Sequence, residues 1–304
     1  MRPARRYRPS VDAPETRRQF GQVFDGVAEA YDEVRPGYPG ELVDHALARG
    51  GLGAGARVLE VGCGTGKLTE LLAARGLAVD AVDPGPNMIR AAERRVGDRG
   101  GVTFHVGRFE DIDLPEGAFA ALFSATAFHW VDPCVGWRKS ASYLRPGGVL
   151  ALLAHVGVHE EADDEPHEEF MALMRKYAPD VAETLRSPRD LQTILDGAEE
   201  RRANASEAWD WLMGEQHALA VPEAADLFRD VEVTTRVERI EQTADEMWAH
   251  LRTTSLWFRI DPANRDALEA EDRRNVERRG GSLRFTHAAV LMTALRRDGS
   301  VTRV

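Results

Sequence analysis

The chain has 304 residues, of which 43% are hydrophobic, and 50 acidic against 39 basic side chains give a net charge of -11. This length fits one large domain with an inserted piece, and the acidic balance argues against general nucleic-acid binding, because phosphate contacts require positive surface. No apolar run approaches the roughly 18 residues of a membrane-spanning helix, and two cysteines make no disulfide framework. We therefore expect a cytoplasmic protein without nucleic-acid or membrane partners.

The N-terminal part is basic and then helical. Residues 1–20 are rich in Arg, with no apolar stretch that would indicate a secretory signal, and we expect a flexible basic tail. Residues 17–34 have apolar side chains at helical spacing, and the Pro- and Gly-containing segment 35–40 ends this pattern. A second helix is expected over 41–51, where it stops at glycines.

Strand and helix patterns then alternate as far as residue 156. The predicted strands are 57–61, 78–83, 102–107, 119–126 and 149–156, and the predicted helices are 67–75, 87–96 and 133–144. This alternation predicts right-handed crossovers and a parallel sheet that is covered on both faces.

The pattern changes after the fifth strand. An acidic loop over 159–169 leads into helical patterns that continue to about residue 228, and alternating segments at 231–242 and 283–297 indicate two more strands. We therefore predict an α/β fold, a doubly wound Rossmann-like sheet of seven mostly parallel strands with an inserted helical lid.

The most informative segment is VLEVGCGTGKLT at residues 58–69, where a buried strand meets a Gly-rich turn and a helix. This order places a ligand at the carboxyl end of the first strand. A phosphate-binding P-loop would require Gly where Val61 stands and Ser or Thr where Leu68 stands. The P-loop interpretation therefore fails at two positions.

A dinucleotide-binding fingerprint, G-x-G-x-x-G, fits this segment better. Gly62 and Gly64 match it, whereas Lys67 occupies the position of the third Gly. Asp83 ends the next strand about 20 residues further on, where a carboxylate can accept hydrogen bonds from both hydroxyls of a ribose. An NAD(P)-dependent oxidoreductase thus remains an alternative.

A third pattern, E-x-G-x-G-x-G, fits without exception and begins at Glu60. It resembles motif I of the class I S-adenosylmethionine-dependent methyltransferases. Three further segments resemble that family in the expected order: FDGVAEAYDEVRPGYP at 24–39, ATAFHW at 125–130 and LRPGG at 144–148. Together they are similar to the ubiquinone-type and trans-aconitate-type small-molecule methyltransferases.

The resemblance implies S-adenosylmethionine as cofactor and methyl transfer to a small-molecule acceptor by in-line displacement. It also implies a methyltransferase domain over 21–156 and 230–304, with 157–229 as a helical insertion or lid. A non-catalytic cofactor-binding protein on the same fold is a further alternative, because a fold does not by itself determine a function. No oligomeric state is predicted.

The resemblance further assigns the cofactor-binding residues. They are Tyr31, Arg35, Glu60, Gly62, Gly64, Gly66, Asp83, Met88, Phe109, Glu110 and Ser124. The turn and Glu60 would follow the methionine portion, and Asp83 would hold the ribose. Met88 and Phe109 would lie on either side of the adenine. Arg35 would pair with the cofactor carboxylate, because a guanidinium forms strong charge-assisted hydrogen bonds to that group.

The acceptor side is marked by His129, which follows the fourth strand at the carboxyl edge of the sheet. An imidazole titrates near neutrality, so His129 is the candidate catalytic base, although it could instead only hydrogen-bond in the site or shape it. Phe128 and Trp130 would form an apolar wall beside it. His155 and His159 lie in a strand and a loop, where their spacing does not favour a metal site, and none is predicted.

Overall fold

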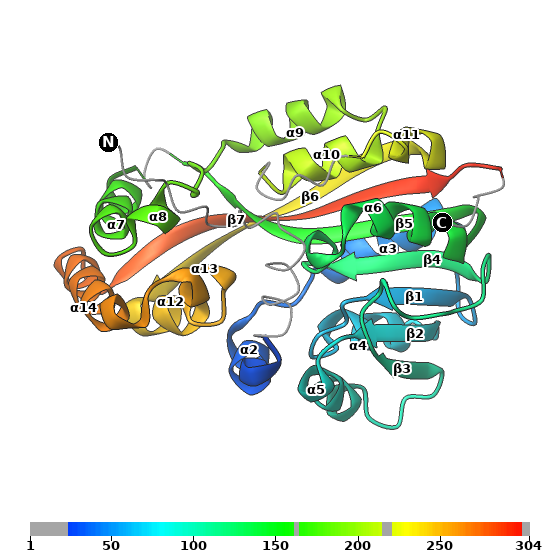
Figure 1. Ribbon diagram of the computed structural model, residues 1–304, viewed down its shortest axis with the longest axis horizontal. Helices are drawn as coiled ribbons and strands as arrows, with labels where there is room; N and C mark the ends of the chain where they lie inside the picture. The colour runs from blue at the N-terminus through cyan, green and yellow to red at the C-terminus, as the bar shows by residue number, and fades with distance from the viewer. Residues whose placement is uncertain (1–23, 161–163, 215–220, 300–304) are drawn as a thin grey trace, which may run out of the picture.

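One seven-stranded sheet organises the molecule (Figure 1). The computed structural model describes residues 24–160, 164–214 and 221–299. The strands follow the order β3-β2-β1-β4-β5-β7-β6; the first five are parallel, and β7 runs antiparallel to both β5 and β6. Their bounds are β1 (Arg57–Val61), β2 (Ala78–Asp83), β3 (Val102–Val106), β4 (Phe119–Ala125), β5 (Leu144–Val158), β6 (Phe228–Thr243) and β7 (Ser282–Arg296). The predicted fold class is confirmed.

Helices cover both faces of this sheet because its strands are apolar on both sides. One face packs against α3 (Gly40–Arg49), α4 (Lys67–Ala74) and α5 (Pro86–Val96). The other face packs against α6 (Pro133–Tyr143), α9 (Leu191–Glu200), α10 (Ala205–Leu212) and α11 (Ala224–Leu227). Val58 and Leu59 illustrate the cause, since these consecutive, fully buried residues belong to opposite cores.

The three longest strands, β5, β6 and β7, extend past the parallel part and carry a separate group of helices at their far ends (Figure 1). This helical lobe consists of α7 (Asp164–Tyr177), α8 (Pro179–Ala182), α12 (Ala244–Leu251), α13 (Ser255–Arg259) and α14 (Pro262–Arg278). It has its own apolar core, at whose centre Trp248 and Leu268 are fully buried.

The predicted insertion over 157–229 is therefore divided in space. Its first helices, α7 and α8, pack in the helical lobe, whereas α9, α10 and α11 pack on the sheet. The division into a methyltransferase domain and a lid stays a prediction, and the basic tail expected over residues 1–20 lies outside the described residues.

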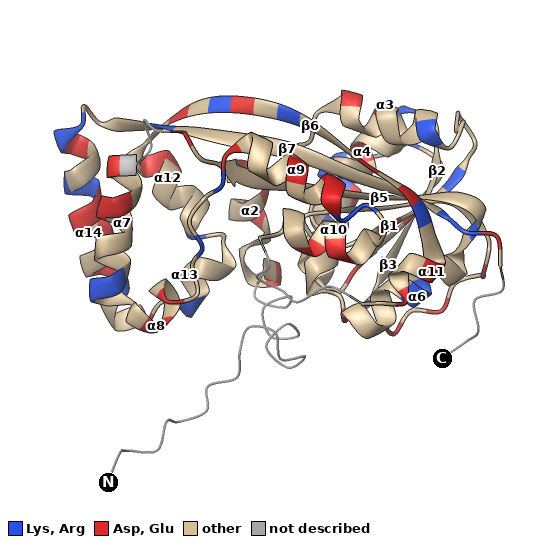
Figure 2. Ribbon diagram, turned by 90° about the horizontal axis from the view of Figure 1, so that it is seen from above, with Lys and Arg blue, Asp and Glu red and all other residues tan. Residues whose placement is uncertain are grey.

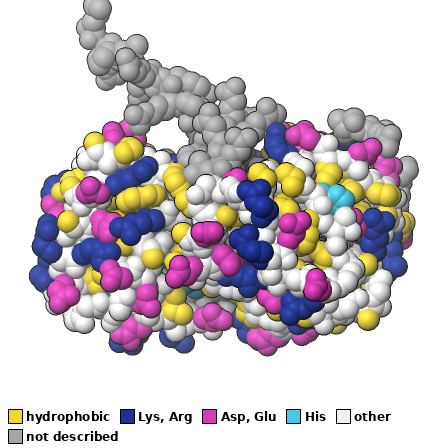
Figure 3. All heavy atoms as spheres, turned by 90° about the horizontal axis from the view of Figure 1, so that it is seen from below, with side chains coloured by type: hydrophobic (Ala, Val, Ile, Leu, Met, Phe, Trp, Pro, Cys, Tyr) yellow, Lys and Arg dark blue, Asp and Glu magenta, His cyan; other side chains and the backbone are white. Residues whose placement is uncertain are grey.

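Charged side chains of both signs are interspersed over the surface. Acidic residues come first along α7 and basic residues lie in its last turn, whereas both signs occur along α14 (Figure 2). Ion pairs join α7 to α14 and to the residue that follows it, such as Lys176–Glu271 at 2.7 Å and Arg279–Glu169 at 3.1 Å. The face in Figure 3 likewise mixes both signs and does not show a continuous basic stripe. In the described part of the chain, every helix is too short or too polar to cross a membrane.

Candidate active site

The turn after β1 depends on three glycines with positive φ angles, namely Gly62 at +71°, Gly64 at +54° and Gly66 at +83°. This left-handed region favours glycine. A Cβ on Gly62 would lie 2.2 Å from the Cβ of Ala127, and one on Gly66 would lie 2.9 Å from the Cα of Ala92. A Cβ on Gly64 would meet nothing within 4 Å. Gly62 and Gly66 thus permit close packing, whereas Gly64 faces open space.

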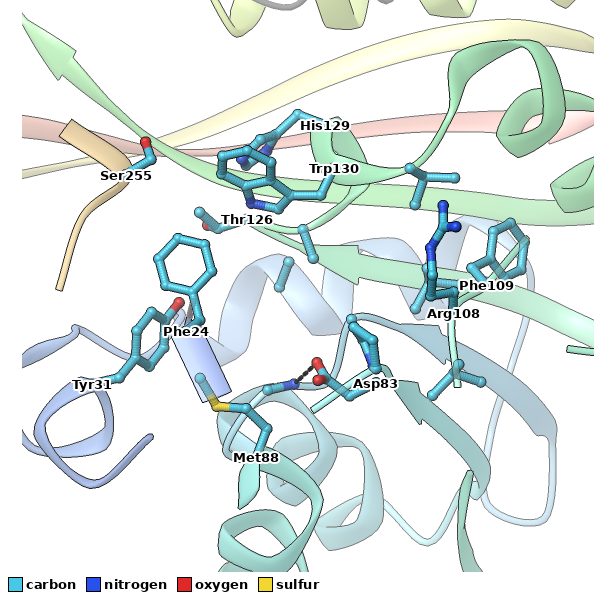
Figure 4. Close-up of a pocket in the computed structure, with 18 of the residues that line it drawn as sticks. Phe24, Tyr31, Asp83, Met88, Arg108, Phe109, Thr126, His129, Trp130 and Ser255 are labelled. Atoms are coloured by element: carbon cyan, nitrogen blue, oxygen red, sulfur yellow. Dashed lines mark hydrogen bonds between the residues drawn. The ribbon is translucent and has the colours of Figure 1, made fainter. Parts of the chain in front are cut away.

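Asp83 closes this turn from the end of β2. Its Oδ2 accepts a hydrogen bond from the Gly64 N–H at 2.9 Å (dashed in Figure 4), and its Oδ1 accepts one from the Gly85 N–H at 2.8 Å. Burial raises the pKa of Asp83 to about 6, against the lowering effect of these two N–H groups. Each carboxylate oxygen can accept a further hydrogen bond, so Asp83 can hold a ligand while it fixes the turn.

A cavity of about 440 Å³ opens at this carboxyl edge of the sheet. Nine of the twelve predicted site residues line it: Tyr31, Arg35, Gly62, Gly64, Asp83, Met88, Phe109, Glu110 and His129. The other three, Glu60, Gly66 and Ser124, do not line it. The predicted roles of all twelve stay predictions.

Two of these three residues, Ser124 and Glu60, are buried near the carboxyl ends of β4 and β1. The Ser124 hydroxyl is fully buried and donates to the Val61 carbonyl oxygen at 2.8 Å, so it joins β4 to β1. Glu60 is 1% exposed, and burial raises its pKa to about 8. Its Oε2 has no hydrogen-bond partner in the described ranges. The structure therefore buries the Glu60 carboxyl group in its neutral form, away from the cavity.

The end of the cavity around Asp83 is bounded by Met88 and Phe109, which are both almost fully buried (Figure 4). Next to them, the Glu110 carboxylate accepts hydrogen bonds from the Asp132 N–H at 3.0 Å and the Arg108 guanidinium at 2.6 Å. The charge of Glu110 is therefore already compensated within the chain.

The N-terminal segment η1 (Phe24–Val27) and α2 (Ala28–Val34) forms a cap that two aspartates anchor. Helix α5 has no capping side chain of its own, and Asp25 supplies one by accepting from the N–H groups of Asn87 at 2.7 Å and Met88 at 3.2 Å. Asp32 accepts from Arg95 of the same helix at 2.6 Å. The sequence did not predict these anchors, because no local pattern marks a contact between distant segments.

Arg35 follows the cap and contributes a positive charge to the cavity wall. Its guanidinium lies 5.2 Å from the ring centroid of Tyr31 and donates to the hydroxyl and the carbonyl oxygen of Thr253 at 3.0 and 2.8 Å. Within the ranges that the structure describes, Arg35 forms no ion pair. Burial lowers its pKa, but an arginine remains charged. This charge is available to an anion.

His129 lies in the short helix η2 (Phe128–Trp130), where it is 6% exposed and its ring centroid is 4.7 Å from that of Trp130. The neighbouring Thr126 also lines the cavity and has a φ of +51°, which is unusual for a β-branched residue. Its hydroxyl is 2.6 Å from the hydroxyl of Tyr38. Strained residues cluster at functional sites, and the sequence did not reveal this one.

Comparisons with known proteins point to methyltransferases. Residues 59–152 match the protein family described as a methyltransferase domain. An uncharacterised methyltransferase of Mycobacterium tuberculosis is 39% identical over 138 residues, which are 45% of this chain and 54% of that protein. The ubiquinone biosynthesis O-methyltransferase of Xanthomonas axonopodis pv. citri is 39% identical over 102 residues, 33% of this chain and 43% of that protein. The chain thus spans about half the length of the curated relatives it matches.

A solved structure shares the fold. A proposed type II methyltransferase from Anaeromyxobacter dehalogenans superimposes with a TM-score of 0.57 at 21% identity, over 86% of this chain and 97% of that one. The family match thus identifies residues 59–152 as a methyltransferase domain, and the solved structure shares the fold of this chain.

Proposed function

We propose that this chain binds S-adenosylmethionine in the cavity and transfers its methyl group to a small-molecule acceptor. The observation that carries the proposal is the pairing of Asp83 with the open turn at Gly64. Calorimetric titration with S-adenosylmethionine, followed by transfer of a radiolabelled methyl group into a small-molecule cell extract, tests it. Saturable binding and a labelled small molecule are expected, and absence of binding would contradict the proposal.

The residues present fit this cofactor. Gly64 leaves open space where a side chain would project, so the turn can approach a ligand with its backbone. Asp83 would accept hydrogen bonds from the ribose hydroxyls, between the buried side chains of Met88 and Phe109. Arg35 forms no ion pair within the described residues, so its guanidinium would be able to pair with the carboxylate of the methionine portion.

When bound, the cofactor supplies a methyl group that its sulfonium already activates. The chain therefore has to bind and align the acceptor and exclude water. The cap held by Asp25 and Asp32 covers one side of the cavity, and Thr254 and Ser255 of the helical lobe contribute to its wall. His129 would receive the proton of the acceptor.

Cofactor affinity is expected to decrease below about pH 6, because the pKa of Asp83 is raised to about 6 by burial. The ribose hydroxyls donate to the ionised form, so protonation of Asp83 removes acceptors and weakens binding about tenfold per pH unit below that pKa. Calorimetry between about pH 5 and pH 8 measures this dependence, with circular dichroism as the check that the protein remains folded. A constant affinity over that range would mean that Asp83 does not bind the cofactor in its ionised form.

The variant His129→Gln is expected to lower kcat for the identified acceptor by about a hundredfold or more, which is typical for loss of a general base. Cofactor affinity should stay within about twofold of the wild-type value. Single-turnover transfer of a labelled methyl group measures the loss of rate, and a parallel titration measures cofactor affinity, so an effect on catalysis is distinguished from an effect on cofactor binding. Unchanged kcat would leave His129 with a structural role only.

A further inference from the structure

We propose that the end of the cavity between the sheet and the helical lobe is the acceptor site, and that it takes an aromatic acceptor without a positive charge. The inference rests on the proposed function, since it names the class of molecule that would receive the methyl group. It depends on three features of the described residues: the positions of the two ends of the cavity, the side chains that form the wall at each end, and the charges of those side chains.

The cavity has two chemically distinct ends (Figure 4). Asp83, Met88 and Phe109 surround the end that fits the adenosine. Phe24 of the cap and Trp130 of η2 surround the other end, which Thr254 and Ser255 of the helical lobe also line. This second end, the acceptor end, is thus built from three parts of the chain that meet only in the folded protein.

Aromatic rings form much of the wall at the acceptor end. The ring centroid of Phe24 lies 5.8 Å from that of Trp130 at 58°, 6.0 Å from that of Tyr31 at 72°, and 6.4 Å from that of Phe258 at 88°. Three of these four residues line the cavity. Tilted and edge-to-face arrangements at these distances are the favourable ones for aromatic rings, so another ring of the acceptor can extend the group.

The acidic residues that line the cavity lie at the adenosine end. Among the described lining residues they are Asp83 and Glu110, and the latter is paired with Arg108. An ammonium group at the acceptor end would therefore find no carboxylate in the described wall. A protonated amine also has no lone pair with which to attack.

The basic groups at the acceptor end reinforce this selectivity. Arg35 would pair with the cofactor carboxylate, and His155 is kept neutral because burial and the nearby charges lower its pKa to about 4. His250 lies near the Arg35 guanidinium and His287 lies near His155, and burial lowers the pKa of both, although Glu238 acts to raise that of His287. Ser255, the first residue of α13, also lines the cavity, and its hydroxyl has no hydrogen-bond partner in the described ranges. The acceptor end thus favours a ring that carries no positive charge and has a polar substituent.

The proposal can be tested by saturation-transfer NMR on the full chain, with its cofactor site filled by S-adenosylhomocysteine. Four probe molecules are compared. They are p-cresol, p-hydroxyphenylacetate, tyramine and methylcyclohexanol, which differ in charge or in the presence of the aromatic ring. We expect p-cresol and p-hydroxyphenylacetate to bind at least about tenfold more tightly than the other two. Equal or tighter binding of tyramine or methylcyclohexanol would overturn the proposal, as would absence of binding by the phenols.

Variants of Trp130 supply the matched control. Trp130→Leu is expected to weaken p-cresol binding about tenfold, and Trp130→Phe to restore most of it, because only the second variant retains a ring. Both should bind S-adenosylhomocysteine like the wild type. Equal p-cresol affinity in the two variants would contradict an aromatic wall. Failure of the wild type to bind S-adenosylhomocysteine is a separate result, which would overturn the proposed function itself.

Discussion

The variant Asp83→Asn is expected to bind S-adenosylmethionine at least about a hundredfold more weakly than the wild type. Two hydrogen bonds from ribose hydroxyls to a carboxylate contribute about 1.5–3 kcal/mol each. An asparagine keeps the shape of the side chain but replaces one acceptor oxygen by a donor. That donor would then face either the Gly64 or the Gly85 N–H, which both now donate to Asp83. Calorimetry on the folded variant measures the loss.

Asp80→Asn is the matched control for this change. Asp80 lies on the same strand and is almost equally buried, but it pairs with Arg57 and His105, both at 2.9 Å, and does not line the cavity. Its replacement should lower stability while cofactor affinity stays within about twofold of the wild type. Comparable loss of affinity in the two variants, or none in Asp83→Asn, would remove Asp83 from the site.

The variant Gly62→Ala is expected to lower the free energy of unfolding by about 2–5 kcal/mol, as a left-handed backbone costs about 1–2 and overpacking about 1–3. The added methyl group would lie 2.2 Å from the Cβ of Ala127, at a φ of +71°. Since Ala127 belongs to the cavity wall, relief of this clash would move the wall as well. Urea denaturation of the variant and the wild type measures the difference.

Gly64→Ala separates strain from packing in the same turn. Its φ of +54° is also left-handed, but a Cβ there would meet no atom within 4 Å. We therefore expect a loss of only about 1–2 kcal/mol in stability, together with a clear loss of cofactor affinity, because Gly64 lines the cavity. If Gly62→Ala were as stable as Gly64→Ala, the close packing at Ala127 would not be a real constraint.

The sheet was predictable because its strands are short apolar runs between clear turn signals. Predicted strands 57–61 and 78–83 agree with β1 and β2 to the residue. The fifth strand was predicted over 149–156, but β5 spans Leu144–Val158. Its extra residues pair with β4 at one end and β7 at the other, as in Phe119↔Leu144 and Val158↔Thr286. Such long-range pairing leaves no local signal. The sequence therefore predicted helices after the fifth strand, but not that α7 and α8 pack with α12, α13 and α14 at the far ends of β5, β6 and β7.

Site residues were predictable where the backbone conformation of a sequence motif requires a particular type of residue. Gly62 and Gly64 follow from the turn, and Asp83 follows from its position at the end of the next strand. Glu60 also fits the motif, but β1 buries it beneath the turn, because successive side chains on a strand face opposite ways. Ser255 reaches the cavity only through the tertiary packing of the helical lobe, which no local pattern encodes.

A crystal structure of the chain with S-adenosylhomocysteine tests the central claim most directly. We predict that the adenosyl group lies over the turn at Gly62–Gly66, with both ribose hydroxyls donating to the carboxylate of Asp83. An adenosyl group bound anywhere else on the chain, or over the turn without a contact to Asp83, would contradict the account.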